Sequence, residues 1–174
     1  MGIQAIKDKI RVVPDFPQKG ILFRDLTTVF KDPKCLNDLS TLMTDTYKGK
    51  GITKVVGIES RGFIMGPVMA NNLGAGFVTL RKPGKLPADT YQASYEKEYG
   101  LDTIEIHKDA LTEEDVVLIH DDLLATGGTM LAAYELVKRF NVKKIYINFI
   151  VELEDLNGRT LFPEEIEVES LIKY

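Results

Sequence analysis

The segment from Val116 to Met130, VVLIHDDLLATGGTM, constrains the fold of this chain more than any other segment. Val116 to Ile119 is a continuous apolar run, which predicts a strand that is covered on both faces of a parallel sheet. Asp121 and Asp122 mark the carboxyl end of this strand. A helical pattern, LAAYELVKRF, begins soon afterwards, so the segment predicts a strand, a polar loop and a helix in that order.

The polar loop of this segment predicts a ligand with two different groups. Ala125 to Thr129, ATGGT, supplies small residues, glycines and hydroxyls at a helix N-terminus, where backbone amides suit a phosphate monoester. The adjacent Asp121 and Asp122 suit a sugar diol, because ionised carboxylates accept hydrogen bonds from hydroxyl groups. A ribose 5-phosphate would satisfy both requirements.

The rest of the chain alternates predicted strands with predicted helices. Helices are predicted around residues 4–11, along an apolar stripe from Leu36 to Tyr47, and over Gly62 to Leu73. Strands are predicted for Lys54 to Ile58, Gly76 to Leu80, Leu101 to Ile106 and Lys144 to Val151. This alternation indicates an α/β fold with a mostly parallel central sheet flanked by helices.

Two segments interrupt the alternation. Residues 13–27, VPDFPQKGILFRDLT, are rich in turn-forming and aromatic residues and predict a packed irregular element. Residues 81–99 carry prolines, glycines and many charges, and they predict a loop that is too polar to pack and longer than an ordinary connection. A long loop of this kind in a compact domain is usually functional.

Composition excludes several classes of protein. The chain of 174 residues suits one domain, and its net charge of −4 gives no bulk attraction for nucleic acid or an anionic membrane. Cys35 is the only cysteine, which excludes an intrachain disulfide. His107 and His120 do not form a pair with metal-ligand spacing. The N-terminus lacks the apolar core of a signal peptide, so we expect a cytoplasmic protein.

Polar side chains follow three of the predicted strands at their carboxyl ends. They are Glu59-Ser60-Arg61, then Arg81-Lys82, and finally Asp121-Asp122. Because ligands of α/β sheets bind beyond the carboxyl ends of the strands, we expect these residues to form a single site. The first turn suits an anion, and Arg81, Lys82 and Lys85 form either a cation cluster for an anion or an ordinary solvated surface.

Taken together, these motifs resemble the type I phosphoribosyltransferases, and most closely the adenine phosphoribosyltransferases. The resemblance runs from the PDFP motif at Pro14 to the VELEDLNGR segment ending at Arg159. It implies one phosphoribosyltransferase domain over residues 1–174, with a small hood at about 1–33, a core at about 34–174 and a flexible lid loop. The implied reaction transfers 5-phosphoribosyl from 5-phosphoribosyl-1-pyrophosphate (PRPP) to adenine, giving AMP and pyrophosphate in purine salvage.

The resemblance also assigns a role to each motif. It implies that Asp121 and Asp122 hold the ribose of PRPP, that Glu98 is the catalytic residue, and that Tyr99 of the lid helps to shield the closed site from water. The residues expected to hold the 5-phosphate are Ala125, Thr126, Gly127, Gly128 and Thr129. The residues expected to hold pyrophosphate are Glu59, Ser60, Arg61, Arg81, Lys82 and Lys85. The residues expected to bind adenine are Leu22, Phe23 and Arg24.

The resemblance further implies a Mg²⁺ ion that is held mainly by PRPP oxygens and water, with no direct set of protein ligands. A homodimer is expected, and neither nucleic acid nor a membrane is an expected partner. Hypoxanthine and guanine enzymes carry an acidic residue where this chain has Ala125, and that acid works at N7 of the purine. Because alanine cannot do so, the proton chemistry is expected at Glu98, which favours adenine over a 6-oxopurine.

Two other classes of protein remain as alternatives. A nucleotide-sensing regulator on the same fold would bind PRPP but would lack the base hood and the lid. A phosphoacceptor signalling domain also uses paired acids at strand ends, but its pair lies early in the chain. Here the pair lies two-thirds along the chain and precedes TGGT, which argues against the second alternative.

Overall fold

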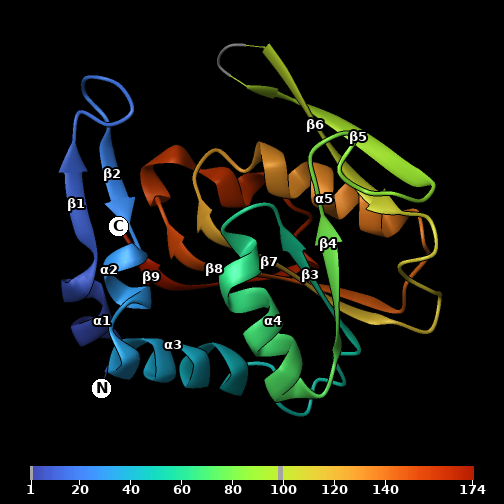
Figure 1. Cartoon of the computed structure of the whole chain (residues 1–174), viewed down its shortest axis with the longest axis horizontal. Coiled ribbons are helices and arrows are strands. Elements are labelled where there is room, and N and C mark those ends of the chain that lie inside the picture. The colour runs from blue at the N-terminus through green and yellow to red at the C-terminus, as the bar shows by residue number, and fades with distance from the viewer. Residues whose placement is uncertain (1, 98–99) are drawn as a thin grey trace. The chain divides into compact units, whose positions relative to one another are not determined.

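The computed structural model describes residues 2–97 and 100–174 (Figure 1). The chain divides into two compact units, Met1–Thr46 and Tyr47–Tyr174, which we call the N-terminal unit and the C-terminal unit. Within the described residues, we find no helix that is both long enough and apolar enough to cross a membrane.

The N-terminal unit combines short helices with a small antiparallel hairpin. Its elements are α1 (Ile3–Lys9), β1 (Arg11–Pro14), β2 (Leu22–Asp25), α2 (Thr27–Phe30) and α3 (Pro33–Asp45). Helix α3 begins where the Asp32 carboxylate accepts hydrogen bonds from the amides of Lys34 and Cys35, both at 3.0 Å.

The hairpin corrects the prediction of an irregular element over residues 13–27. Strands β1 and β2 pair antiparallel, from Arg11 opposite Asp25 to Pro14 opposite Leu22. The Arg11 guanidinium donates to the Asp25 carboxylate, its Nε at 2.9 Å from Oδ2, and so joins the two strands. Proline and glycine occupy the connection between the strands, which is why the composition alone indicated irregular structure.

The C-terminal unit is built on a five-stranded sheet in which every neighbouring pair is parallel. The strand order is β4-β3-β7-β8-β9. The strands are β3 (Lys54–Ile58), β4 (Gly76–Leu80), β7 (Val116–Leu124), β8 (Lys144–Glu152) and β9 (Glu167–Lys173). The prediction of a mostly parallel central sheet is therefore confirmed.

Helices cover both faces of this sheet. Helix α4 (Gly62–Leu73) packs on β3, β4 and β7, and α5 (Gly128–Lys138) packs on β7 from the opposite side (Figure 1). The core is formed by fully buried apolar side chains of the central strands and of α5, including Val56, Ile119, Ile147, Leu136 and Val137. Burial on both faces explains the continuous apolar runs of β7 and β8.

A two-stranded hairpin lies on the α5 side of the sheet (Figure 1). Its strands are β5 (Thr90–Lys97) and β6 (Gly100–His107), paired antiparallel. Strand β5 corrects the prediction of an unpaired loop over residues 81–99. Tyr91, Ala93 and Tyr95 alternate along β5 and pack against the core, so a strand period is present among the charged residues.

Two further differences from the sequence prediction concern the central sheet, namely the length of β7 and the presence of β9. Strand β7 continues through the acid pair to Leu124, four residues beyond His120, because its ladder with β8 extends from Val116 to Leu124. Strand β9, which adds an edge strand beside β8, was missed. Its sequence EVESLIK mixes charged and apolar residues, and only Val168 and Ile172 are buried. Two short 3-10 helices, η1 (Glu154–Leu156) and η2 (Gly158–Leu161), connect β8 to β9.

Candidate active site

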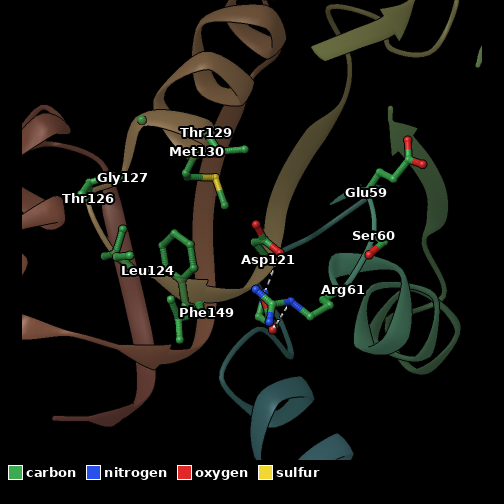
Figure 2. Close-up of a pocket in the computed structure, with 14 residues that line it drawn as sticks. Glu59, Ser60, Arg61, Asp121, Leu124, Thr126, Gly127, Thr129, Met130 and Phe149 are labelled. Carbon is green, nitrogen blue, oxygen red and sulfur yellow. Dashed lines mark hydrogen bonds and ion pairs between the residues drawn. The ribbon is translucent and has the colours of Figure 1, made fainter. Parts of the chain in front are cut away.

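A cavity of about 340 Å³ lies at the carboxyl ends of β3 and β7 (Figure 2). These two strands mark the switch point of the sheet, because the chain proceeds from β3 to one edge and from β7 to the other. Such a crevice is the usual ligand site of an open α/β sheet. The cavity is lined by Glu59, Ser60, Arg61, Asp121, Asp122, Leu123, Leu124, Ala125, Thr126, Gly127, Gly128, Thr129, Met130 and Phe149.

The two members of the acid pair occupy different environments. Asp121 is partly exposed and lies between the Ser60 turn and the residues at the start of α5 (Figure 2). Asp122 is only 3% exposed, and its Oδ2 lies 3.0 Å from Nε of Arg61. The sequence placed both carboxylates at one site, and both line the cavity, but Asp121 is the more exposed and Asp122 is ion-paired.

The environment raises the pKa of both carboxyl groups. Burial, and then the neighbouring charge of Asp122, raise the pKa of Asp121 well above its usual value. Burial also raises the pKa of Asp122, although the positive charge of Arg61 opposes this change. Adjacent groups with perturbed pKa values in a cleft are typical of functional sites.

The loop between β7 and α5 forms a cradle of backbone amides, which we call the phosphate cradle (residues 125–129). The first hydrogen bond of α5 runs from the Leu131 amide to the Gly127 carbonyl at 2.9 Å. The amides that precede Leu131 at the start of the helix therefore have no acceptor within the helix. Gly127 has φ +89°, a conformation that a residue with a side chain rarely adopts. These features suit an anion at the start of α5.

The phosphate cradle is supported from behind by Gly158. A Cβ atom added at Gly158 would lie 2.4 Å from the Ala125 carbonyl oxygen, and one added at Gly127 would lie 2.8 Å from the Gly158 carbonyl oxygen. The two backbones therefore touch, and neither glycine tolerates a side chain without displacement of the cradle. Gly158 belongs to the NGR part of the resemblance, but sequence reasoning did not assign it to the site.

The turn after β3 forms the opposite wall of the cavity. Its Glu59–Ser60 peptide bond is cis, and Ser60 and Arg61 are exposed beside the cavity. Helix α4 begins at Gly62, where an added Cβ would lie 2.8 Å from the carbonyl oxygen of His120. This close contact holds the turn against β7, next to the acid pair.

The basic segment of residues 81–85 does not line the cavity but is attached to its wall through Glu59. The Glu59 carboxylate accepts the Lys82 amide at 2.9 Å and contacts the Arg81 guanidinium at 3.3 Å and the Lys85 ammonium at 3.7 Å. The hydrogen bond from the Lys82 amide, with the nearby cations, lowers the pKa of Glu59 against the effect of burial. Glu59 is directed away from Asp121 in Figure 2, so its carboxylate organises the cations.

The remaining predicted site residues lie elsewhere or outside the described residues. Leu22, Phe23 and Arg24 form β2 of the N-terminal unit, where the Phe23 ring packs edge-on against Phe16 with centroids 5.1 Å apart. Their contact with adenine stays a prediction. Glu98 and Tyr99 lie outside the described residues, and their roles stay predictions as well.

Sequence reasoning missed several apolar residues of the cavity wall. Phe149 is opposite Asp121 in the register of β7 and β8, and Leu124 and Met130 flank the phosphate cradle. The position of Phe149 is detectable in the sequence only when the ends of the two strands are aligned. His120, by contrast, packs inside the protein and does not line the cavity. It is fully buried, and its Nδ1 lies 2.8 Å from Oδ1 of Asn148.

The comparisons with known proteins agree with this geometry. The family model described as "Phosphoribosyl transferase domain" matches residues 26–171. The adenine phosphoribosyltransferase of Bacteroides thetaiotaomicron is 63% identical, over 99% of this chain and 98% of its own length.

Two solved structures are similar over almost the whole chain. The adenine phosphoribosyltransferase of Thermoanaerobacter pseudethanolicus is 46% identical with a TM-score of 0.92, and the alignment covers 99% of each chain. The APRTase of Giardia lamblia, complexed with 9-deazaadenine, is 47% identical with a TM-score of 0.94, and the alignment covers 100% of this chain and 98% of that one. The sheet order, the cavity at its switch point and these matches establish that the chain belongs to the phosphoribosyltransferase family.

Proposed function

We propose that this chain is an enzyme of purine salvage that transfers the 5-phosphoribosyl group of PRPP to adenine, giving AMP and pyrophosphate. One observation carries the proposal: Asp121, the phosphate cradle and the Ser60–Arg61 turn line a single cavity, in a chain with 63% identity to an adenine phosphoribosyltransferase over nearly its whole length. The 9-deazaadenine bound by the Giardia lamblia APRTase is an adenine analogue, which supports the choice of base.

The ribose 5-phosphate part of PRPP would occupy the cavity from Asp121 to the start of α5. Asp121, which is the more exposed acid, would accept hydrogen bonds from the ribose hydroxyls. Asp122 would support this contact from behind while Arg61 balances its charge. The amides of the phosphate cradle, with Thr126 and Thr129, would bind the 5-phosphate at the helix N-terminus.

The pyrophosphate group would lie on the opposite wall, at Ser60 and Arg61. Arg81, Lys82 and Lys85 lie near this wall through their contacts with Glu59. In the reaction, N9 of adenine forms a bond to C1 of the ribose while the bond from C1 to the pyrophosphate oxygen breaks, and the ring proton that adenine loses passes to the departing pyrophosphate or to solvent. Negative charge develops on the departing pyrophosphate, so fixed cations beside it lower the barrier. The carboxylate of Asp121 favours positive charge on the ribose ring.

A Mg²⁺ ion would enter with PRPP. Mg²⁺ binds oxygen ligands and keeps several waters, and one or two protein carboxylates are enough when substrate phosphates supply the rest. Among the described residues no cluster of three or more His, Cys, Asp and Glu side chains could hold a metal ion. The partly exposed Asp121 is the carboxylate that fits a substrate-borne ion, which would neutralise pyrophosphate charge.

The base would be read by residues that the resemblance assigns. Leu22, Phe23 and Arg24 are the predicted adenine contacts, and Glu98 is predicted to donate a proton or hydrogen bond to N7. Ala125 lines the cavity and offers no acid for that task. A homodimer, a cytoplasmic location and a lid that includes Tyr99 also stay predictions.

A substrate panel tests the proposal. The enzyme is supplied with PRPP and Mg²⁺ together with adenine, hypoxanthine, guanine or orotate, and pyrophosphate release is followed. We expect release with adenine and background rates with the other bases. Release with hypoxanthine but not adenine would contradict the assigned base, and the absence of release with every base would favour a PRPP-binding regulator.

A further inference from the structure

A charged cluster joins the basic segment to the β5–β6 hairpin. We call it the hairpin cluster, and it consists of Lys82, Tyr95, Lys97 and Asp102. The Asp102 carboxylate is ion-paired with the ammonium groups of both lysines. It also accepts a hydrogen bond from the Tyr95 hydroxyl at 3.0 Å, and Lys82 Nζ lies 3.4 Å from the same hydroxyl oxygen. Three side-chain donors therefore converge on one carboxylate, which also accepts the Thr103 amide at 2.9 Å.

The hairpin cluster lies beside the phosphate cradle. A Cβ atom added at Gly128, the first residue of α5, would lie 3.6 Å from Cδ2 of Tyr95 and 3.7 Å from the carbonyl oxygen of Glu96. The Tyr95 ring thus rests on the start of the helix that would bind the 5-phosphate. On the other side, the Lys82 amide is bonded to Glu59, a residue of the cavity wall.

Lys82 is consequently held between the two walls of the site, but its ammonium group is bound to Asp102. Lys82 is not among the residues that line the cavity in the described part of the chain. Its side chain is 37% exposed, so it can move without unpacking the core. To bind an anion in the cavity, the ammonium group must leave the carboxylate.

Asp102 keeps its charge in this setting. Partial burial opposes its ionisation, yet hydrogen bonds from Lys82, Lys97 and Tyr95 lower its pKa below the usual value. A permanent carboxylate competes with any anionic ligand for the same ammonium group. An internal contact that must break on binding reduces the apparent affinity of the ligand.

We propose that Asp102 competes with the pyrophosphate group for Lys82, and so weakens the binding of both PRPP and pyrophosphate. The inference rests on the proposed function, because it takes Lys82 as a pyrophosphate-binding residue. Asp102 is a positioning residue, since it acts through Lys82 and not on the substrate. No covalent step is involved: one ion pair is exchanged for another.

The substitution Asp102→Asn tests the proposal, because it removes the charge and keeps the size. Titration calorimetry of PRPP with Mg²⁺, in the absence of adenine, should show a Kd that is about 5-fold lower, as expected for a partly exposed ion pair. The inhibition constant of pyrophosphate should fall by a similar factor. Asp102→Glu should retain the affinity of the unmodified enzyme. Glu96→Gln, which makes the same charge change at an exposed site of the hairpin, should have no effect.

A second background separates Lys82 from Lys97. In Lys82→Met, the further change Asp102→Asn should leave the Kd for PRPP unchanged. An equal gain of affinity in both backgrounds would overturn the assignment to Lys82, and so would unchanged or weaker binding in Asp102→Asn alone. If the wild-type protein releases AMP and the substitution Asp102→Asn does not change the Kd for PRPP, only this inference is refuted. Wild-type protein that binds no PRPP would refute the proposed function.

A further measurement uses the unmodified protein and so does not depend on whether a variant folds. The ¹³C resonance of the Asp102 carboxyl carbon should shift when pyrophosphate and Mg²⁺ are added, because Lys82 leaves the carboxylate. A resonance that stays constant at saturating pyrophosphate would overturn the proposal.

Discussion

Arg61 Nε lies 3.0 Å from Oδ2 of Asp122, so a cation from the turn after β3 neutralises the buried member of the acid pair on β7. This contact joins the two strand ends that flank the switch point of the sheet. It also leaves Asp121 as the more exposed carboxylate of the pair. The stability of the site therefore depends on a residue that is proposed to bind pyrophosphate.

Removal of Arg61 should destabilise the protein. We expect Arg61→Met to lower the free energy of unfolding at pH 7 by about 1–2 kcal/mol, less than for a fully buried pair because Arg61 is half exposed. The pKa of Asp122 is already raised by burial, so its ionised form destabilises the fold as pH rises through that pKa. Urea denaturation should thus show that Arg61→Met loses less free energy of unfolding, relative to the unmodified protein, at pH 5 than at pH 7. Arg61→Lys is the control, and equal deficits at both pH values would contradict the assignment.

Asp121→Asn should stabilise the fold while it weakens PRPP binding. The raised pKa of Asp121 means that its charge at pH 7 costs stability, and asparagine removes that charge. We expect a higher Tm and a Kd for PRPP that is about 10-fold higher or more, because a hydrogen bond to a charged group is lost. In the unmodified enzyme, PRPP affinity should fall on acidification at a pH above that of an ordinary carboxylate. Asp109→Asn, at an exposed position, is the control; unchanged PRPP affinity in Asp121→Asn would refute the ribose contact.

Gly127→Ala should distort the phosphate cradle. The added Cβ would lie 2.8 Å from the Gly158 carbonyl oxygen at a residue with φ +89°, and such strain costs about 1–3 kcal/mol. Thermal unfolding should reveal this loss, together with weaker PRPP binding. For stability alone, Gly128→Ala is the matched comparison, since its Cβ would meet only ordinary contacts at 3.6 Å. Equal Tm values for the two variants would argue against the close contact with Gly158.

The buried His120 should make the protein less stable in mild acid. Burial lowers the pKa of His120 to about 4, from 6.5 for an ordinary histidine, so the unfolded chain binds a proton that the folded protein does not. The contribution of His120 to the free energy of unfolding should fall as pH decreases from about 6.5 to about 4 and then level off. We expect His120→Val to lose this part of the pH dependence, and His107→Gln to retain it. A His120→Val curve parallel to that of the unmodified protein would show that other groups are responsible.

Glu98→Gln should lower kcat by about 100-fold with little change in the KM for PRPP, as expected for loss of a general acid. Steady-state kinetics with PRPP as the varied substrate, at saturating adenine, would measure both constants. Glu96→Gln provides the matched control two residues away on β5. Unchanged turnover in Glu98→Gln would show that Glu98 is not a catalytic residue.

Local patterns predicted the central sheet well, because period and composition act on neighbouring residues. The bounds of β3 and α4 agree with the apolar runs of the sequence. The β1–β2 hairpin and strand β5 were missed, since turn-forming and charged residues obscured their alternation, whereas the strand predicted over Leu101 to Ile106 is confirmed as β6. Strand β9 was missed because it lies at a sheet edge with few buried residues.

The sequence by itself determined the class of fold and the chemical inventory of the site. Apolar runs, glycines and acids in the order of residues 116–130 are local, and they were sufficient to predict a ribose 5-phosphate site. Only the tertiary structure decided which charges meet. Asp122 pairs with Arg61, Glu59 with the basic segment, and Asp102 with Lys82. Each pair joins residues that are about 20 positions or more apart, so its existence depends on strand order and register, which no local pattern encodes.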